Sequence, residues 1–216
     1  MAESSREYFE SIGAGWDELR RGFYSDHVRE RALNEAAVVA GRVAADVGSG
    51  TGFLTRGLLE RGLQVIAIDP SPAMLDALAR RFPFPGRVDC RIGEAEHLPL
   101  ADGAVDYCLA NMCLHHVASP PAAIREMVRV LAPGGRLVIT DLDRHDHEAL
   151  RDEHHDRWMG FERSLVARWL RDAGLREVRV AAVGEDCCAA SRSGAAIAVG
   201  IFVASGAKAG LEKEPR

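Results

Sequence analysis

The fold is decided by the stretch Asp46-Val47-Gly48-Ser49-Gly50-Thr51-Gly52. A short apolar run, residues 43–45, precedes it and is typical of a buried strand, while residues 53–59 follow it with the pattern of a helix. Glycine at such a strand-to-helix turn permits backbone angles that a side chain forbids, and it lets a ligand lie directly on the backbone. The helix presents unpaired N–H groups and the positive end of its dipole. The stretch therefore predicts a nucleotide-like ligand at the carboxyl ends of parallel strands.

The acidic residue that ends the next predicted strand supports this interpretation. Residues 64–68 have an apolar strand pattern, and Asp69 follows them about 20 residues after the glycine loop. A carboxylate at that spacing commonly accepts hydrogen bonds from ribose hydroxyls. A nicotinamide-dependent dehydrogenase would favour the spacing G-x-G-x-x-G, whereas here the third glycine, Gly52, comes one residue early. The glycine spacing therefore disfavours that class of enzyme.

Strand and helix patterns alternate along most of the chain. Strands are predicted at 42–47, 64–69, 87–92, 105–110 and 136–140, and helices at 52–62, 70–81 and 120–131. This alternation implies a parallel sheet with helices on both faces. A helix at 162–173 is then followed by two strands, 176–183 and 195–204, with no helix between them. We therefore expect an α/β, doubly wound, mostly parallel seven-stranded sheet with an antiparallel edge hairpin.

Three segments are expected along the chain. Residues 1–41 form a mostly helical arm, in which aromatic residues including Tyr8 and Trp16 recur at roughly helical spacing and are expected to pack on the main domain. Residues 42–206 form the main domain. The polar residues 207–216 are expected to be a flexible tail.

Composition limits the classes of partner. The formal net charge is −5 and the sequence pI is near 5.9, which argues against a nucleic-acid groove because such grooves are usually basic. No apolar signal core is visible near Met1, and no run approaches the length of a membrane span. The five cysteines, an odd number, suggest free thiols in a reducing cytosol. We therefore expect a cytoplasmic protein without nucleic-acid or membrane partners.

Five segments, taken together, resemble class I methyltransferases. They are DVGSGTG at 46–52, VIAIDPSPAML at 65–75, GEAEHLPL at 93–100, NMCLHHV at 111–117 and LAPGGRLVITD at 131–141. The resemblance is closest to small-molecule enzymes of the quinone C-methyltransferase and arsenite methyltransferase type, and it covers residues 43–141 strongly. It implies a Rossmann-like fold, S-adenosylmethionine as cofactor and a small-molecule methyl acceptor.

The resemblance also implies roles for individual residues. The ribose would be bound by the acid at the end of the second strand, the adenine by an apolar side chain and the loop after the third strand, and the methionine part by the glycine loop and the end of the fourth strand. Asp69 would bind the ribose. The adenine would be bound by Met74, Glu94 and Ala95, and the methionine part by Asp46, Gly48, Gly50 and Asn111. In related methyltransferases an N-terminal arm partly covers the cofactor, which suggests a lid role for Tyr8 and Trp16.

The acceptor side is less well specified, because methyl transfer from a sulfonium needs alignment and exclusion of water more than a particular catalytic residue. Cys187 and Cys188 are expected in a polar loop after the sixth strand, and Cys113 lies near the place where arsenite methyltransferases carry a metalloid-binding cysteine. Soft thiolates select soft ions, so the three thiols suggest a metalloid or soft metal as an alternative acceptor.

Histidines provide the other candidates on the acceptor side. His115 and His116 follow the fourth strand, where either could act as a base for an oxygen or carbon acceptor, or could simply pack. The segment 141–158 carries four histidines, His145, His147, His154 and His155, beside Asp143; they could form a metal site, but a substrate cap in which Trp158 and Phe161 line a pocket is favoured.

The leading hypothesis is therefore a methyltransferase that acts on a small molecule. A cofactor-binding module without turnover is the alternative from another class, because fold does not fix function. The acceptor, its reacting atom and the oligomeric state are not specified by the sequence.

Overall fold

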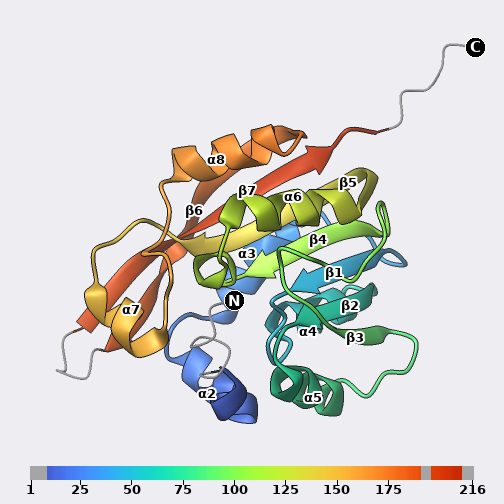
Figure 1. Ribbon diagram of the computed structural model, residues 1–216. Coiled ribbons are helices and arrows are strands. Elements are labelled where there is room, and N and C mark those ends of the chain that lie inside the picture. The colour runs from blue at the N-terminus through green and yellow to red at the C-terminus, as the bar shows by residue number, and fades with distance from the viewer. Residues whose placement is uncertain (1–8, 191–195, 211–216) are drawn as a thin grey trace, which may run out of the picture.

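The computed structural model describes residues 9–190 and 196–210, so Tyr8 lies outside the described residues (Figure 1). Seven strands form one sheet in the order β3-β2-β1-β4-β5-β7-β6. Their bounds are β1 (Val43–Val47), β2 (Gln64–Asp69), β3 (Val88–Ile92), β4 (Val105–Asn111), β5 (Leu131–Leu142), β6 (Leu175–Ala190) and β7 (Ala196–Lys208).

Strand direction agrees with the expected sheet. Strands β1 to β5 are parallel to their neighbours, and β7 runs antiparallel between β5 and β6. The predicted fold is confirmed, a Rossmann-like, mostly parallel seven-stranded sheet that carries an antiparallel hairpin at one edge. Strand β7 begins only six positions after the end of β6, too few for the crossover of a dozen or more residues that a parallel neighbour needs, so the two strands pair antiparallel.

Helices cover both faces of the sheet (Figure 1). They are α2 (Trp16–Arg21), α3 (Asp26–Ala36), α4 (Phe53–Glu60), α5 (Pro72–Arg81), α6 (Pro120–Val130), α7 (Glu148–His154) and α8 (Arg163–Asp172), with short 3₁₀ turns η1 (Gly13–Gly15) and η2 (Leu114–His116). Helices α3, α4 and α5 share one hydrophobic core, and α6 and α8 share the other. Alternate residues of each strand supply the two cores: Ala44 and Leu109 face the first, and Ala45 and Cys108 face the second.

The part of the expected N-terminal arm that forms α3 belongs to the first core. Val28 and Leu33 on α3 are fully buried. The approach of α3 to α4 is close, because a Cβ placed on Gly57 would lie 2.5 Å from Leu33 Cδ1. The last strand is also longer than the sequence pattern indicates. Strand β7 continues to Lys208, whose ammonium donates to three backbone carbonyls at and just beyond the end of α6.

Strand β6 is longer than the sequence predicts. The expected strand ends at residue 183, but β6 continues to Ala190 through an irregularity in its pairing with β7 between Ala182 and Asp186. Gly184, at φ +92°, provides the backbone conformation for this irregularity. Glu185 then accepts hydrogen bonds from the backbone N–H and the hydroxyl of Ser25, at the start of α3. The polar residues that suggested a loop therefore anchor the strand to α3.

No helix within residues 9–190 and 196–210 is long and apolar enough to cross a membrane.

Candidate active site

A first pocket opens at the carboxyl ends of β1, β2 and β4. All eight residues that the sequence predicts for cofactor binding line it: Asp46, Gly48, Gly50, Asp69, Met74, Glu94, Ala95 and Asn111. Parallel strands place their carboxyl ends at one edge of the sheet, so residues up to 65 positions apart in the chain meet there.

The glycine loop is tightly constrained at Gly48. Its N–H donates to the carbonyl of Ile68 at 2.8 Å, and its φ is +67°. A Cβ at this position would lie 2.6 Å from the sulfur of Cys113, so a side chain would meet both backbone strain and a collision. Gly50 has a φ of +51°, and its N–H donates to a carboxylate oxygen of Asp69 at 2.9 Å.

Two buried carboxylates, Asp46 and Asp69, form the polar part of the first pocket. Asp69 accepts from the backbone N–H groups of Gly50 and Ser71, each at 2.9 Å, and each of its oxygens keeps a lone pair for a further donor. Burial raises the pKa of Asp69 to about 6, although those two N–H groups oppose the shift. Asp46 accepts from the hydroxyl of Thr55 at 2.7 Å, and burial raises its pKa to about 7. Both groups therefore change charge near neutral pH.

Arg20 and Trp16, both from α2, close the first pocket on the side of the N-terminal segment. Trp16 lies over the glycine loop, because a Cβ on Gly50 would lie 3.8 Å from its indole ring. Arg20 is 7% exposed, and its guanidinium carbon lies 4.2 Å from the centre of the Phe53 ring. Its Nη1 donates to the carbonyl of Tyr24, whereas its buried Nε–H has no hydrogen-bond partner within the described part of the chain. The pocket therefore contains a buried cation with spare capacity for an anion.

A second pocket adjoins the first. The two share Phe9, Trp16, Tyr24 and Met112 as a common wall. The rest of the second pocket comes from the loop between α2 and α3, from η2, from the end of β5, from α7 and the residues after it, and from β6: Phe23, His115, Leu142, Leu150, His154, Asp156, Cys187 and Ala189. The hydroxyl of Tyr24 accepts from the amide of Asn111 at 2.9 Å. Tyr24 therefore connects the predicted cofactor side with the second pocket.

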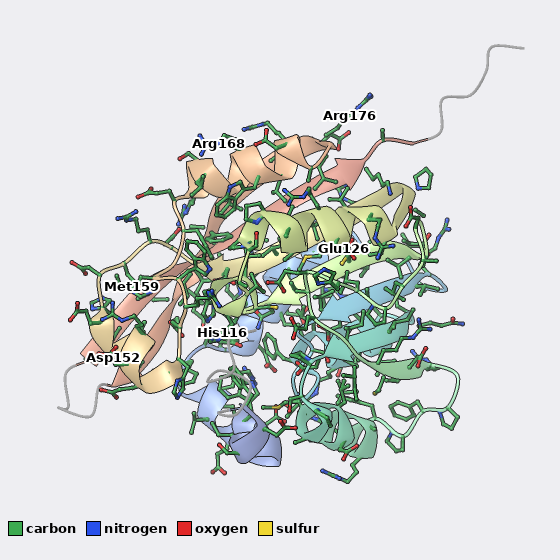
Figure 2. The ribbon with its side chains drawn as sticks, in the orientation of Figure 1. His116, Glu126, Asp152, Met159, Arg168 and Arg176 are labelled. Atoms are coloured by element: carbon green, nitrogen blue, oxygen red, sulfur yellow. The ribbon has the colours of Figure 1, made fainter. Side chains whose placement is uncertain are left out.

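His115 and His116 lie where the two pockets meet. His116 lines the first pocket and His115 the second, and their ring centres are 4.0 Å apart. Figure 2 labels His116 near the middle of the molecule, between α2 and the sheet. Burial alone would lower the pKa of His115, but the carboxylates of Asp141 and Asp156 outweigh it and raise that pKa to about 9. Burial and the neighbouring His115 lower the pKa of His116 well below its usual value.

Comparison with known proteins identifies the family. A methyltransferase domain family matches residues 45–139. An uncharacterised methyltransferase of Geobacillus kaustophilus is 32% identical over 153 residues, which cover 70% of this chain and 69% of that protein. The chain belongs to the class I methyltransferases. The family implies S-adenosylmethionine as the methyl donor.

Two further comparisons add context to this methyltransferase. An uncharacterised methyltransferase of Mycobacterium tuberculosis is 41% identical over 137 residues, 63% of this chain, and the match spans only about half, 54%, of that relative. A chain from the complex of the Haloferax volcanii Trm112 methyltransferase activator with a methyltransferase superposes with a TM-score of 0.76. That likeness covers 93% of this chain and 97% of the other at 20% identity, so it concerns the fold alone.

The three thiols of the methyltransferase do not converge, contrary to the expectation for a metalloid site. Cys113 lies against Gly48 in the first pocket, Cys187 lines the second pocket, and Cys188 is exposed. Successive side chains of a strand point to opposite faces, so the extension of β6 separates the vicinal pair. Within the described ranges, no cluster of three potential metal ligands contains any of these cysteines.

The expected substrate cap is also wrong in its residues. Trp158 is 39% exposed and lines neither pocket; its indole N–H instead donates to the carbonyl of Val117 at 2.9 Å. Phe161 is buried and packs edge-on against Trp169 of α8. The residues of this region that line the second pocket are instead Leu142, at the end of β5, and Leu150, His154 and Asp156, which α7 and its end bring inward.

The histidine-rich segment does not form the metal site that its composition suggested. Asp143 is paired with Arg163, and the rings of His145 and His147 stack on each other. The cluster of possible metal ligands that the described chain does form is His115, His116 and Asp156, which joins η2 to the end of α7.

Sequence reasoning missed three residues of this site, Arg20, Tyr24 and Asp156. Arg20 stands in a run of charged residues, Asp17 to Arg21, in which nothing distinguishes a buried arginine from an exposed one. Asp156 lies in a densely charged segment with the same difficulty. A fourth residue, Asp141, could have been predicted to lie at the carboxyl edge of the sheet. It is an acid at the end of an apolar strand, which is the pattern that identified Asp69.

Proposed function

We propose that this methyltransferase transfers the methyl group of S-adenosylmethionine to a small-molecule acceptor bound in the second pocket. The observation that carries the proposal is the shared wall of the two pockets, because an acceptor in the second pocket can approach a methyl group that is held in the first. Transfer from a sulfonium is an in-line displacement, so the protein's main contribution is to align the two reactants and keep water away.

In this proposal different residues of the first pocket bind the ribose, the adenine and the methionine part of the cofactor. Asp69 accepts hydrogen bonds from the ribose hydroxyls, Met74 packs on the adenine, and Glu94 with Ala95 borders the adenine edge. The methionine part lies on the glycine loop beside Asp46 and Asn111. Trp16 covers it from α2, as the lid role suggested, while the same role for Tyr8 stays a prediction.

Arg20 supplies the group that the sequence did not, a cation for the methionine carboxylate. Its guanidinium lines the first pocket, is buried, and has an N–H without a partner in the described chain. Within the residues that the structure describes, the carboxylate paired with it is that of Asp26, which is 3.9 Å away and half exposed. An incoming carboxylate would therefore gain charge-assisted hydrogen bonds from a donor that is already desolvated.

On the acceptor side, His115 and His116 are the groups placed to contact the reacting atom. The position of one histidine in each pocket supports that role. The soft-metalloid alternative keeps only Cys187 in the second pocket, and one thiol is a weak basis for binding such an ion.

The test combines cofactor binding with turnover. Calorimetry should give S-adenosylmethionine an affinity that falls about tenfold or more in Arg20→Met, since a charge-assisted hydrogen bond contributes about 1.5–3 kcal/mol. The matched control is Arg21→Met, because Arg21 is the neighbouring arginine and is exposed. Equal loss in both variants would contradict the assignment of Arg20.

Formation of S-adenosylhomocysteine should then be measured with phenols, quinols, hydroxy acids, amines, thiols and arsenite. Turnover with any one of the organic acceptors supports the proposal. Tight cofactor binding without turnover on the whole panel would favour the alternative of a binding module that does no chemistry.

A further inference from the structure

The buried cluster of His115, His116 and Asp156 has the ligand types and spacing of a metal site. Their ligand atoms all lie within 4.8 Å of one another, and none of the three side chains is more than 7% exposed. His115 Nε2 is 3.7 Å from Asp156 Oδ1, which is too long for a hydrogen bond. Ligand atoms about 2.0–2.2 Å from one tetrahedral ion lie roughly 3.3–3.6 Å apart, so a small contraction would close the cluster around an ion.

The outer contacts of both histidines leave the same ring nitrogen free. His115 Nδ1 lies 2.7 Å from Asp141 Oδ1, and His116 Nδ1 lies 3.4 Å from the carbonyl of His155. A carbonyl only accepts hydrogen bonds, and the Asp141 carboxylate already accepts from two backbone N–H groups, so each Nδ1 carries the hydrogen. In the neutral form of each ring the lone pair is then on Nε2, and an ion that binds there displaces the second proton that His115 holds in the ion-free protein. Metal-binding histidines in proteins are held in this way, with the other ring nitrogen donating to a carboxylate or carbonyl.

The third ligand, Asp156, is held against η2 by backbone contacts. The N–H groups of Arg157 and Trp158, the next two residues, both donate to the carbonyl of His115 at 3.0 Å. The indole of Trp158 adds a bond to the carbonyl of Val117. The segment that carries Asp156 is therefore fixed to the turn that carries the histidines, and the spacing of the three ligands does not depend on a flexible side chain alone.

The charges around the cluster also favour a bound cation. Two buried carboxylates, Asp141 and Asp156, flank the histidine pair, and within the described residues no lysine or arginine is paired with either carboxylate. A protonated His115 offsets only one of these two carboxylates, so a divalent ion that displaces that proton would balance both.

We propose that His115, His116 and Asp156 bind one divalent transition-metal ion of the Zn²⁺, Co²⁺, Mn²⁺ or Fe²⁺ class at the wall between the two pockets. Two imidazoles and one carboxylate suit these ions and leave coordination positions open. The open positions face the second pocket, because His115 and Asp156 line it. An acceptor with a hydroxyl and a neighbouring oxygen, such as a catechol-like phenol or a hydroxy acid, fits them.

The role of the ion rests on the proposed function, whereas its binding does not. A bound ion lowers the pKa of a coordinated hydroxyl, whose proton leaves to solvent. The acceptor oxygen then forms the new bond to the methyl carbon while the bond from that carbon to sulfur breaks, and the electron pair stays on sulfur as S-adenosylhomocysteine is formed. Oxygen acceptors are therefore the class that the site favours.

The first experiment measures the ion alone, without any substrate. Purified protein is stripped with a chelator, and Co²⁺ is titrated in while its visible absorption is followed, with Zn²⁺ as competitor. The wild type should bind one equivalent. Asp156→Asn and His116→Gln should weaken binding by at least about tenfold, and so should Asp141→Asn, which acts through His115.

The matched control is His145→Gln, a half-buried histidine whose Nε2 has no partner in the described chain and which lies outside the cluster. It should bind Co²⁺ as the wild type does. Thermal unfolding of each stripped variant, and S-adenosylmethionine binding to Asp156→Asn, check that the fold is intact. No stoichiometric ion, equal binding in Asp156→Asn, or equal loss in His145→Gln would overturn the site.

A second measurement separates this site from the proposed function. If Co²⁺ binds as expected but no acceptor is methylated, the site stands and the proposed function fails. If a phenol or hydroxy acid is methylated equally well before and after stripping, the function stands and the role of the ion is overturned. Turnover that falls at least about tenfold on stripping and returns with added ion supports both.

Discussion

At the scale of single residues, the site separates into positions that a local pattern reveals and positions that it does not. Asp69 was predictable because a carboxylate directly after an apolar strand must lie at the sheet's carboxyl edge, and Gly48 because a strand-to-helix turn needs its backbone freedom. Arg20 and Asp156 are brought in by tertiary packing. Their neighbours in sequence are equally charged, so no local signal separates a buried ligand from a solvated surface.

The buried carboxyl of Asp69 predicts how cofactor binding depends on pH. In the proposed complex, ribose hydroxyls donate to the ionised carboxylate, and burial raises the pKa of that group to about 6. Affinity for S-adenosylmethionine should therefore be highest above pH 7 and fall as the pH drops below about 6, since the protonated form must first lose its proton. Calorimetry across pH 5 to 8 in about half-unit steps measures the effect.

Two variants separate Asp69 from its neighbour in the same pocket. Asp69→Asn should bind weakly and lose the fall near pH 6. Asp46→Asn should retain that fall, because only the second carboxyl, whose pKa is raised to about 7, has been removed. An unchanged profile in Asp69→Asn would show that another group titrates.

At the scale of elements, the alternation of strands and helices was predictable, and the length of β6 was not. The sequence near Gly184 and Glu185 contains the residue types of a turn, yet the pairing with β7 resumes at Asp186 and continues to Ala190. The decisive partner is Ser25, more than 150 residues earlier, which binds Glu185. A contact of that range leaves no trace in local composition.

The extension of β6 predicts unequal reactivity for two adjacent cysteines. The thiol of Cys187 lines the second pocket, and burial raises its pKa to about 12, whereas Cys188 is exposed. Because the thiolate is the reactive form, iodoacetamide should modify Cys188 at least about tenfold faster than Cys187, as measured by peptide mass spectrometry. Cys188→Ser should remove the fast reaction without accelerating Cys187. Equal rates would instead indicate the open loop that the sequence suggested.

At the scale of the whole molecule, the two helices of the N-terminal arm, α2 and α3, have different structural roles. Trp16 and Arg20 of α2 border the pocket, while α3 completes a core of the sheet through Leu33. Periodicity predicted a mostly helical arm but did not distinguish its two parts, because an apolar stripe can face either a sheet or a ligand. The close approach of α3 to Gly57 shows that α3 packs directly on α4.

This division predicts a large difference between two leucines. Leu33→Ala should lower the free energy of unfolding by about 2–5 kcal/mol, as expected for a fully buried leucine. Leu19→Ala on α2, where the side chain is 43% exposed, should change it by less than about 0.5 kcal/mol. Urea denaturation followed by circular dichroism measures both. A small effect at Leu33 would mean that α3 can detach without cost to the domain.

The two pockets draw on different parts of the chain, and that bears on how new specificities arise. Most of the first pocket comes from residues 46–117, whereas Leu142, Leu150 and Ala189 contribute to the second pocket alone. Mutational drift or a combinatorial library at those three positions can therefore reshape the choice of acceptor while the affinity for the methyl donor is inherited unchanged. One ancestral scaffold can diversify into many activities by this route. Tyr24 and Met112 line both pockets, so a substitution at either position changes the binding of the methyl donor and of the acceptor together.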